Sequence, residues 1–196
     1  MTTRMKMRII AASMIALALA LSACGGEEPV KGKVLTGAVA PGWVERGGGA
    51  YSDSHGRAFF GVGESSGLKN LSLLRSNADN RARAEVSKIF QFYTAALMRD
   101  YLASKKAIEP MVSDEERRVE EAMRDLTSSA LSGVIIVEQW HNPDNGKLFA
   151  LARLDLDAFM ELAEKSPEID KSMKDYIDDN AERLHGEIGA GFDSKQ

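Results

Sequence analysis

Apolar residues recur at helical spacing in four stretches of the chain, and they alternate or cluster in three shorter runs. The longest helical stretch follows Asn70, a residue type that commonly caps a helix N-terminus. Apolar side chains three or four residues apart predict a helix from this point: Leu71, Leu74, Ala78, Ala82, Val86 and Ile89. The stripe continues to Tyr101, but residues 89–94 are rich in β-favouring side chains. The pattern alone therefore leaves both one long helix and a helix followed by a strand open.

The second helical stretch begins with a capping box, in which Ser113 and Glu116 can satisfy each other's free amides. Its apolar stripe predicts the buried face of the helix: Val119, Ala122, Met123, Leu126 and Ala130. Gly133 then predicts the end of this helix, because glycine commonly follows the last helical turn.

Two further helices are predicted near the C-terminus. Asp155 or Asp157 can cap the first of them. Ser166-Pro167 predicts the start of the second, because proline suits the first helical position. This last helix is predicted to span residues 166–188 with one apolar face, and residues 189–196 are predicted to be disordered.

Three runs rich in β-branched, aromatic and other apolar residues predict strands: residues 57–63, 134–140 and 147–153. The turn-forming residues 141–146 join the last two into a β-hairpin. The glycines Gly61 and Gly63 are a weak signal for nucleotide binding, which we reject because the rest of that fingerprint is missing. This order of elements predicts an α+β fold with a small, mostly antiparallel sheet and packed helices.

The segment before the first of these strands shows no useful periodicity. Residues 24–42 are rich in glycine and predict a flexible tether. Trp43 is predicted to be a docking residue that pins the start of the folded part, and a ligand-stacking role is the less favoured alternative. Residues 45–56, which include three consecutive glycines, are predicted to be a flexible loop.

The N-terminus has the pattern of an export signal. Residues 1–8 are basic, and residues 9–21 are apolar apart from Ser13. A run of this length fits a signal-peptide core and is short for a bilayer span, which needs about 20 residues. An uncleaved membrane anchor and an ordinary secretory signal are the alternatives.

The chain has a single cysteine, Cys24, at the end of Leu21-Ser22-Ala23-Cys24. These four residues resemble the lipobox of bacterial lipoproteins. The resemblance implies a diacylglyceryl group on the Cys24 thiol, cleavage after Ala23, and N-acylation of the new amine by a chain such as palmitate. It also implies the outer membrane, because Gly25 stands where aspartate would retain a lipoprotein in the inner membrane.

Charge narrows the choice of partners. Of 25 basic side chains, Arg4, Lys6 and Arg8 belong to the predicted signal peptide, so 22 remain against 29 acidic ones, a formal balance of −7. A negative surface argues against sequence-independent binding to nucleic acid. It also provides no polybasic membrane patch, so membrane attachment would depend on the lipid at Cys24.

No constellation of residues predicts catalysis, a cofactor or a metal ion. The three histidines, His55, His141 and His185, lie in separate segments without ligand spacing and are predicted to be surface residues. The cysteine lies in the lipobox, and no nucleophile elbow of the Gly-x-Ser-x-Gly type occurs. We therefore expect a protein without enzymatic activity and without a cofactor.

A series of short motifs resembles one family over residues 41–165. Their order carries the resemblance: Pro41-x-Trp43, Phe59-x-Gly61-x-Gly63, residues 77–85, Gly133-Val134 with Glu138-x-Trp140, and residues 148–155. This order is similar to that of the LPP-twenty-type bacterial lipoproteins and of the related amino-terminal domain of the flagellar protein FlgT. The resemblance implies a strand near residues 89–97 and a non-enzymatic role in the cell envelope.

The sequence thus predicts five parts: a cleaved signal peptide (1–23), a lipidated N-terminus and tether (24–42), an α+β domain (43–165), an amphipathic helix (166–188) and a tail (189–196). Its predicted role is a lipid-anchored interaction or scaffold module at the periplasmic face of the outer membrane. The expected partner is an envelope protein or a second copy of the chain, bound at the hairpin edge or the last helix. The alternative is a lipoprotein that binds a small ligand or glycan through Trp43, Trp140 and nearby tyrosines.

Overall fold

The computed structural model describes residues 32–108 and 113–193. The predicted signal peptide, Cys24, the first part of the tether and the last three residues lie outside this range. The elements are β1 (Lys33–Thr36), α2 (Gly42–Arg46), β2 (Gly49–Asp53), β3 (Gly56–Ser65), α3 (Leu71–Ile108), α4 (Ser113–Leu131), β4 (Ile135–Asn142), β5 (Lys147–Asp155), α5 (Leu156–Lys165) and α6 (Lys171–Asp193). None of the described helices combines the length and the apolar character needed to cross a membrane.

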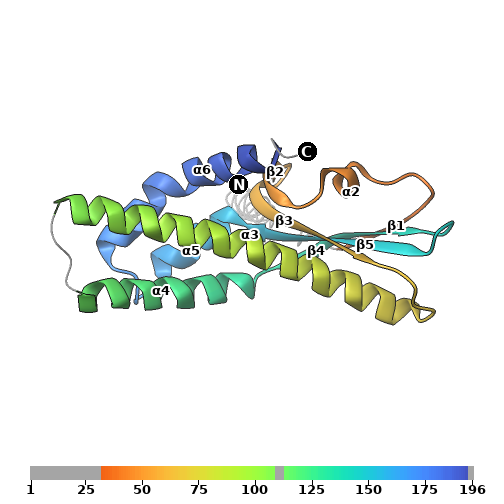
Figure 1. The fold of residues 1–196 in the computed structure, drawn as a ribbon, viewed down its shortest axis with the longest axis horizontal. Helices are drawn as coiled ribbons and strands as arrows, with labels where there is room; N and C mark the ends of the chain where they lie inside the picture. Colours follow the sequence, from red (N-terminus) through yellow and green to blue (C-terminus); the bar gives the residue numbers. More distant parts are fainter. Residues whose placement is uncertain (1–31, 109–112, 194–196) are drawn as a thin grey trace, which may run out of the picture. The chain divides into compact units, whose positions relative to one another are not determined.

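The α+β prediction is confirmed by one five-stranded sheet with the strand order β1-β4-β5-β3-β2. All neighbouring strands are antiparallel except β1 and β4, which are parallel. The predicted hairpin is β4–β5, and Gly146 supplies the positive φ angle of 66° that its turn requires. Helices α3, α5 and α6 pack against the same face of this sheet, and α3 runs across it (Figure 1).

Helix α3 is one continuous helix of 38 residues, so the strand implied by the resemblance near residues 89–97 is wrong. Burial explains the outcome, because Ile89, Phe90, Tyr93 and Leu97 are buried at helical spacing while Phe92 is 60% exposed. Packing of one helical face outweighs the β propensity of these residues. Asn70 caps the helix as predicted, since its Oδ1 accepts hydrogen bonds from the amides of Ser72 and Leu73 at 2.9 and 3.2 Å.

The contact between α3 and β3 is unusually close because it has glycine on one side and alanine on the other. A Cβ atom at Gly63 would lie 2.1 Å from the carbonyl oxygen of Ala78, and one at Gly61 would lie 2.3 Å from that of Ala82. Ala78 and Ala82 are themselves fully buried. The two glycines that weakly suggest a nucleotide site therefore serve helix–sheet packing.

Two strands lie where the sequence predicts a tether and a loop. Strand β1 pairs with β4 from Lys33 to Thr36, so the folded part begins before the predicted boundary at residue 43. Strand β2 pairs with β3 from Gly49 to Asp53, within the predicted loop 45–56. Both are short strands at the edges of the sheet, and their stability comes from their neighbours, which periodicity cannot detect.

The last helix begins and ends later than predicted. Ser166 and Pro167 precede it, and Asp170 caps it through a 2.8 Å hydrogen bond from the amide of Met173 to Oδ1. The helix continues to Asp193, so the predicted disordered tail is helical as far as that residue. Gly189 permits this, because a Cβ there would lie 2.3 Å from the carbonyl oxygen of Ala50 in β2.

Replacement of Gly63 by alanine tests the α3–β3 contact. We expect Gly63→Ala to lower the free energy of unfolding by about 3 kcal/mol, because the helix backbone must move away from β3. The control is Gly186→Ala in α6, where a Cβ meets no atom within 4 Å. That change should raise stability by up to about 1 kcal/mol through helix propensity. Denaturant unfolding of both variants measures the difference, and equal stabilities would contradict this account of the packing.

Candidate functional site

Four aromatic side chains of the strands lie on the sheet face opposite α3, and Trp43 of α2 packs on the same face. We call these five residues the aromatic face: Trp43, Tyr51, Phe60, Trp140 and Phe149. Strand alternation explains the placement of the four strand residues. Leu148 and Ala150 belong to the main core, so Phe149 between them points to the other side. Trp140 lies opposite Phe149 in the β4–β5 register, with ring centroids 5.5 Å apart.

Trp43 and Tyr51, the two aromatic-face residues that come first in the chain, already have partners within the domain. Tyr51 stacks on Phe60 with centroids 4.1 Å apart, and the guanidinium of Arg46 lies 3.6 Å from the Tyr51 centroid. The indole Nε1 of Trp43 donates a hydrogen bond of 3.0 Å to Oε1 of Glu138. These contacts attach α2 to the sheet, as expected for a docking tryptophan. They also occupy the rings that a ligand would stack on.

Arg153 is the most buried cation of the aromatic face, with 4% of its surface exposed. Its Nη1 lies 2.5 Å from Oδ2 of Asp155, and its Nε lies 3.2 Å from Oδ2 of Asp53. Its Nη2 also donates to the carbonyl oxygen of His55 at 3.3 Å. Arg153 therefore joins the β2–β3 turn to the end of β5, and its charge is compensated locally by two carboxylates.

Three buried donors of the aromatic face lack a hydrogen-bond partner: the hydroxyl of Tyr51, Nε1 of Trp140 and Nε of Arg153. The last of these still has the carboxylate of Asp53 as an ion-pair partner. Burial raises the pKa of Tyr51 to about 12, so this hydroxyl keeps its proton at neutral pH. Trp140 is only 4% exposed, which does not fit the predicted use of its ring as an open stacking platform. The unused donors are the feature of this face that would favour a ligand.

The three histidines remain in separate places, but His185 is not the surface residue that the sequence predicts. It is 2% exposed, and its Nε2 lies 3.0 Å from the carbonyl oxygen of Ala58. Its ring meets the edge of Phe59 in the main core. Within residues 32–108 and 113–193, no group of three His, Cys, Asp or Glu side chains could hold a metal ion.

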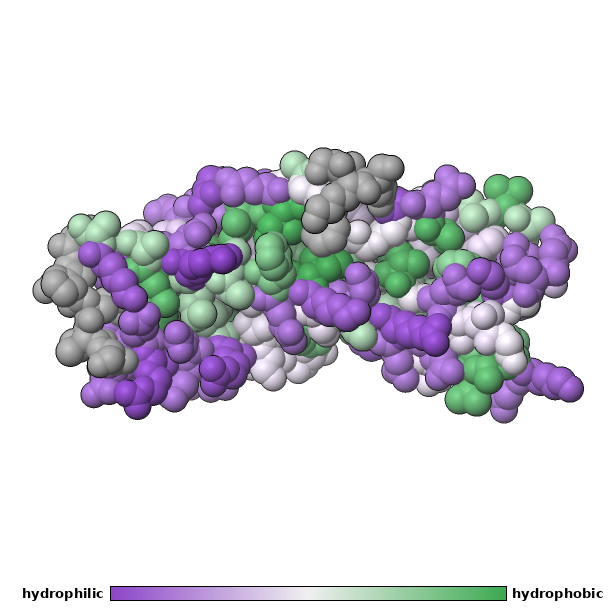
Figure 2. Space-filling view, in the orientation of Figure 1, coloured by the Kyte–Doolittle hydropathy of each residue, from purple (hydrophilic) through white to green (hydrophobic). Residues whose placement is uncertain are grey.

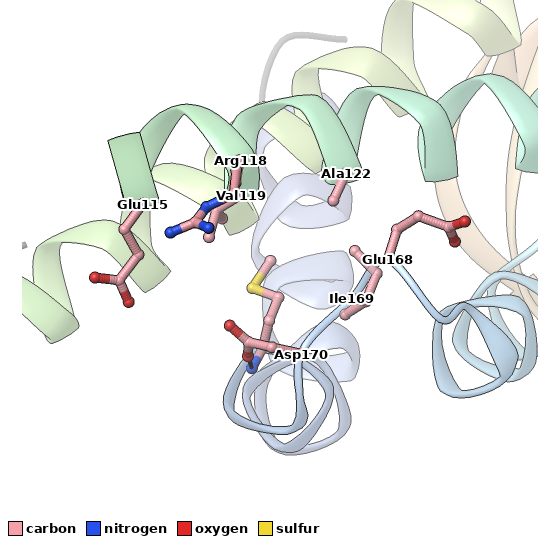
Figure 3. A pocket seen from close by; sticks show the side chains of 8 residues that line it. Glu115, Arg118, Val119, Ala122, Glu168, Ile169 and Asp170 are labelled. Carbon is pink, nitrogen blue, oxygen red and sulfur yellow. Dashed lines mark hydrogen bonds between the residues drawn. The ribbon is translucent and has the colours of Figure 1, made fainter. Parts of the chain in front are cut away.

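The surface hollows lie between helices. One hollow of about 290 Å³ lies between α4 and the segment joining α5 to α6 (Figure 3). Glu115 and Glu168 point away from each other at its two sides, and Asp170 is already used as the cap of α6. A wider groove of about 430 Å³ lies between α3 and α4 and is lined by Met98, Met123 and polar side chains. Charged side chains line both hollows, namely Glu115, Arg118, Glu168 and Asp170 in the first and Glu120 and Arg124 in the second.

The two interaction surfaces expected from the sequence are largely used within the domain. The outer edge of the β4–β5 hairpin is covered by β1. The apolar face of α6 is buried in the core: Met173, Ile177, Ala181, Leu184 and Ile188. Two sheet edges remain among the described residues, those of β1 and β2. Helix α6 packs closely against β2 at Gly189 and Ala50, so the edge of β1 is the more open one.

No protein-family model matches the chain, and no curated protein matches it in sequence. The resemblance to the LPP-twenty-type lipoproteins therefore stays a prediction, as does the family's envelope role.

His185 predicts a specific dependence of stability on pH. Burial is the main cause that lowers its pKa below the ordinary 6.5, and the hydrogen bond to Ala58 and the nearby Glu182 only partly oppose it. The unfolded chain thus takes up this proton at a higher pH than the folded chain does. The stability contributed by the neutral ring is complete above about pH 6.5 and is lost as the pH falls from there toward the lowered pKa.

Urea unfolding at pH 7.5 and 5.5 measures this effect. We expect His185→Gln to lose less stability between these two pH values than the unchanged protein does, since glutamine can still donate to Ala58 but does not titrate. His55→Gln, at an exposed position, should keep the original pH dependence. If both variants behaved alike, His185 would not be the group responsible.

Proposed function

We propose that this chain is a lipid-anchored protein of the cell envelope, whose folded domain is a non-enzymatic interaction module at the periplasmic face of the outer membrane. The observation that carries the proposal is the sequence Leu21-Ser22-Ala23-Cys24, with the chain's single cysteine at the lipobox position after an apolar run. Two or three acyl chains on one residue provide attachment that the acidic mature chain does not provide itself.

The start of the folded part limits the length of the tether between lipid and domain. Strand β1 begins at Lys33, so eight residues separate Cys24 from it. An extended chain of eight residues spans at most about 29 Å. A domain anchored at Cys24 would therefore work close to the membrane surface, and its partners would be other envelope components within that reach.

The edge of β1 is the surface that we propose for a protein partner. Its second edge is unpaired among the described residues, and Val34 is 50% exposed. An edge strand presents a row of backbone donors and acceptors to which an extended segment of another chain can pair. The partner is then an envelope protein or a second copy of this chain that offers such a segment.

The alternative function, binding of a small ligand or glycan, has one observation in its favour. The Tyr51 hydroxyl and the Trp140 indole are buried donors without a partner on the aromatic face. The strand registers place Tyr51 opposite Ala58 and Trp140 level with Glu64, three strands apart, so one small ligand would satisfy only one of them. An acceptor bound at either donor would raise the melting temperature by mass action. The rings of Tyr51 and Trp43 already have partners, which is why we place this function second.

Substitution of Cys24 tests the anchor directly. Cys24→Ala should abolish incorporation of radiolabelled palmitate and leave an uncleaved precursor, because the thiol that receives the lipid is absent. Ser22→Ala keeps a small residue in the lipobox and should be labelled as the unchanged protein is. Labelling of the alanine variant at Cys24 to the normal extent would refute the anchor.

Photo-crosslinking in cells tests the surface. A photoreactive amino acid at Val34 should give a discrete adduct with one envelope protein or with a second copy. The same amino acid at Asp178, an exposed position of α6, should give none. Adducts of equal yield from both positions would argue against a docking edge at β1.

A further inference from the structure

Three of the six large apolar side chains that the described residues expose lie in two short segments. Val39, in the loop after β1, is 86% exposed, and Leu73 and Leu71 at the start of α3 are 50% and 46% exposed. Leu74 next to them is buried, so α3 uses one side for packing and leaves these two leucines outside. Scattered apolar residues are ordinary on a surface, but a group at one end of a domain indicates a contact.

Hydrogen bonds show that these segments belong to the same end. The amide of Gly37 donates to the carbonyl oxygen of His141 at 3.2 Å, which holds the loop after β1 beside the end of β4. The side chain of Gln139 donates to Oδ1 of Asp79 at 2.6 Å, which aligns this point of α3 with β4. Leu71, the first residue of α3, lies about 12 Å along the helix from Asp79. Asn142, the last residue of β4, lies about 10 Å along the strand from Gln139, in the same direction.

The first turn of α3 and the β4–β5 loop therefore lie at the same end of the domain. We call this part of the domain the turn end and define it as residues 37–41, 66–75 and 143–146. Its three segments lie together at the right in Figure 1. Figure 2 shows apolar surface at the places of the loop after β1 and of the start of α3, with polar side chains between them.

The charge of the turn end differs from that of the chain. Residues 66–75 contain Lys69 and Arg75 and no acidic side chain. Both cations are exposed, and neither has an ion-pair partner in the part of the chain that the structure describes. Asp144 is the one carboxylate of the turn end, so its formal balance is +1, whereas the chain as a whole carries −4.

The chain also enters the domain near this end. Strand β1 runs from Lys33 toward the turn end, parallel to β4, and covers about 13 Å. That distance is shorter than the reach of the eight residues between Cys24 and β1. A lipid on Cys24 and the turn end can therefore touch the same membrane leaflet.

We propose that the turn end rests on the lipid surface, with Val39, Leu71 and Leu73 in the interfacial layer and Lys69 and Arg75 against anionic headgroups. Apolar side chains flanked by basic ones are the pattern that binds such an interface. The inference rests on the proposed anchor at Cys24, which keeps the turn end at high local concentration near lipid, so a weak contact suffices. The contact would fix the orientation of the domain on the membrane.

The test uses the mature lipidated protein in phosphatidylcholine vesicles that contain phosphatidylglycerol. Leu71→Cys provides the one free thiol, since the Cys24 sulfur carries lipid, and an environment-sensitive fluorophore is attached there. The control is Phe92→Cys, which is also an exposed apolar position of α3 but lies about 32 Å further along the helix. Brominated lipids should quench the probe at position 71 at least threefold more strongly than the probe at position 92.

A second pair of variants tests the apolar contact itself. With the probe at Val39→Cys, the further change Leu73→Asp should reduce the quenching at least twofold, and omission of phosphatidylglycerol should also reduce it. Equal quenching at positions 71 and 92 in protein that floats with the vesicles would overturn the inference and leave the anchor intact. Protein that fails to float would overturn the anchor and the inference together.

Discussion

The structure depends on the close approach of α3 to β3. Gly61 and Gly63 leave no side chain on that face of the strand, and Ala78 and Ala82 fill the space from the helix. Once α3 is seated, its next turns bring Phe90 and Tyr93 against Phe59 of β3, with centroids 5.2 and 4.8 Å apart. Phe159 of α5 meets Phe90 at 5.2 Å, and the hydroxyl of Tyr93 donates to the carbonyl oxygen of Ala181 in α6. The positions of three helices thus follow from one glycine–alanine contact.

Local signals were sufficient to predict much of this fold. The cap at Asn70, the cap at Asp155 and the β4–β5 hairpin each depend on a few neighbouring residues, and all three are confirmed. Features that depend on distant partners were not predicted. Strands β1 and β2 exist because β4 and β3 pair with them, and His185 of α6 is buried because its ring lies against Ala58 and Phe59 of β3. The wrong prediction of a strand near residues 89–97 rests on the family resemblance. The apolar periodicity alone allows the single long helix that the structure shows.

The candidate site was also predicted only in part, because the surroundings of its residues depend on distant partners. The sequence singles out Trp43 and Trp140. Strand alternation places Trp140 on the aromatic face and α2 carries Trp43 there, yet the indole of Trp43 is hydrogen-bonded to Glu138 and that of Trp140 is buried. The apolar stripe of α6, which the sequence suggests as an interface, fills the core instead. The surfaces that the domain does not use, the edge of β1 and the turn end, both lie close to where the chain enters the fold. If Cys24 carries lipid as we propose, both surfaces would lie within reach of the membrane.

The central claim is that lipid on Cys24 holds this domain in the envelope. Intact-mass and peptide mass spectrometry of the protein extracted from cell membranes tests it most directly. The account predicts a mature chain that begins at Cys24, with a diacylglyceryl group on the sulfur and an acyl chain on the amine. A chain that still carries residues 1–23, or one that begins at another residue with an unmodified cysteine, would contradict it.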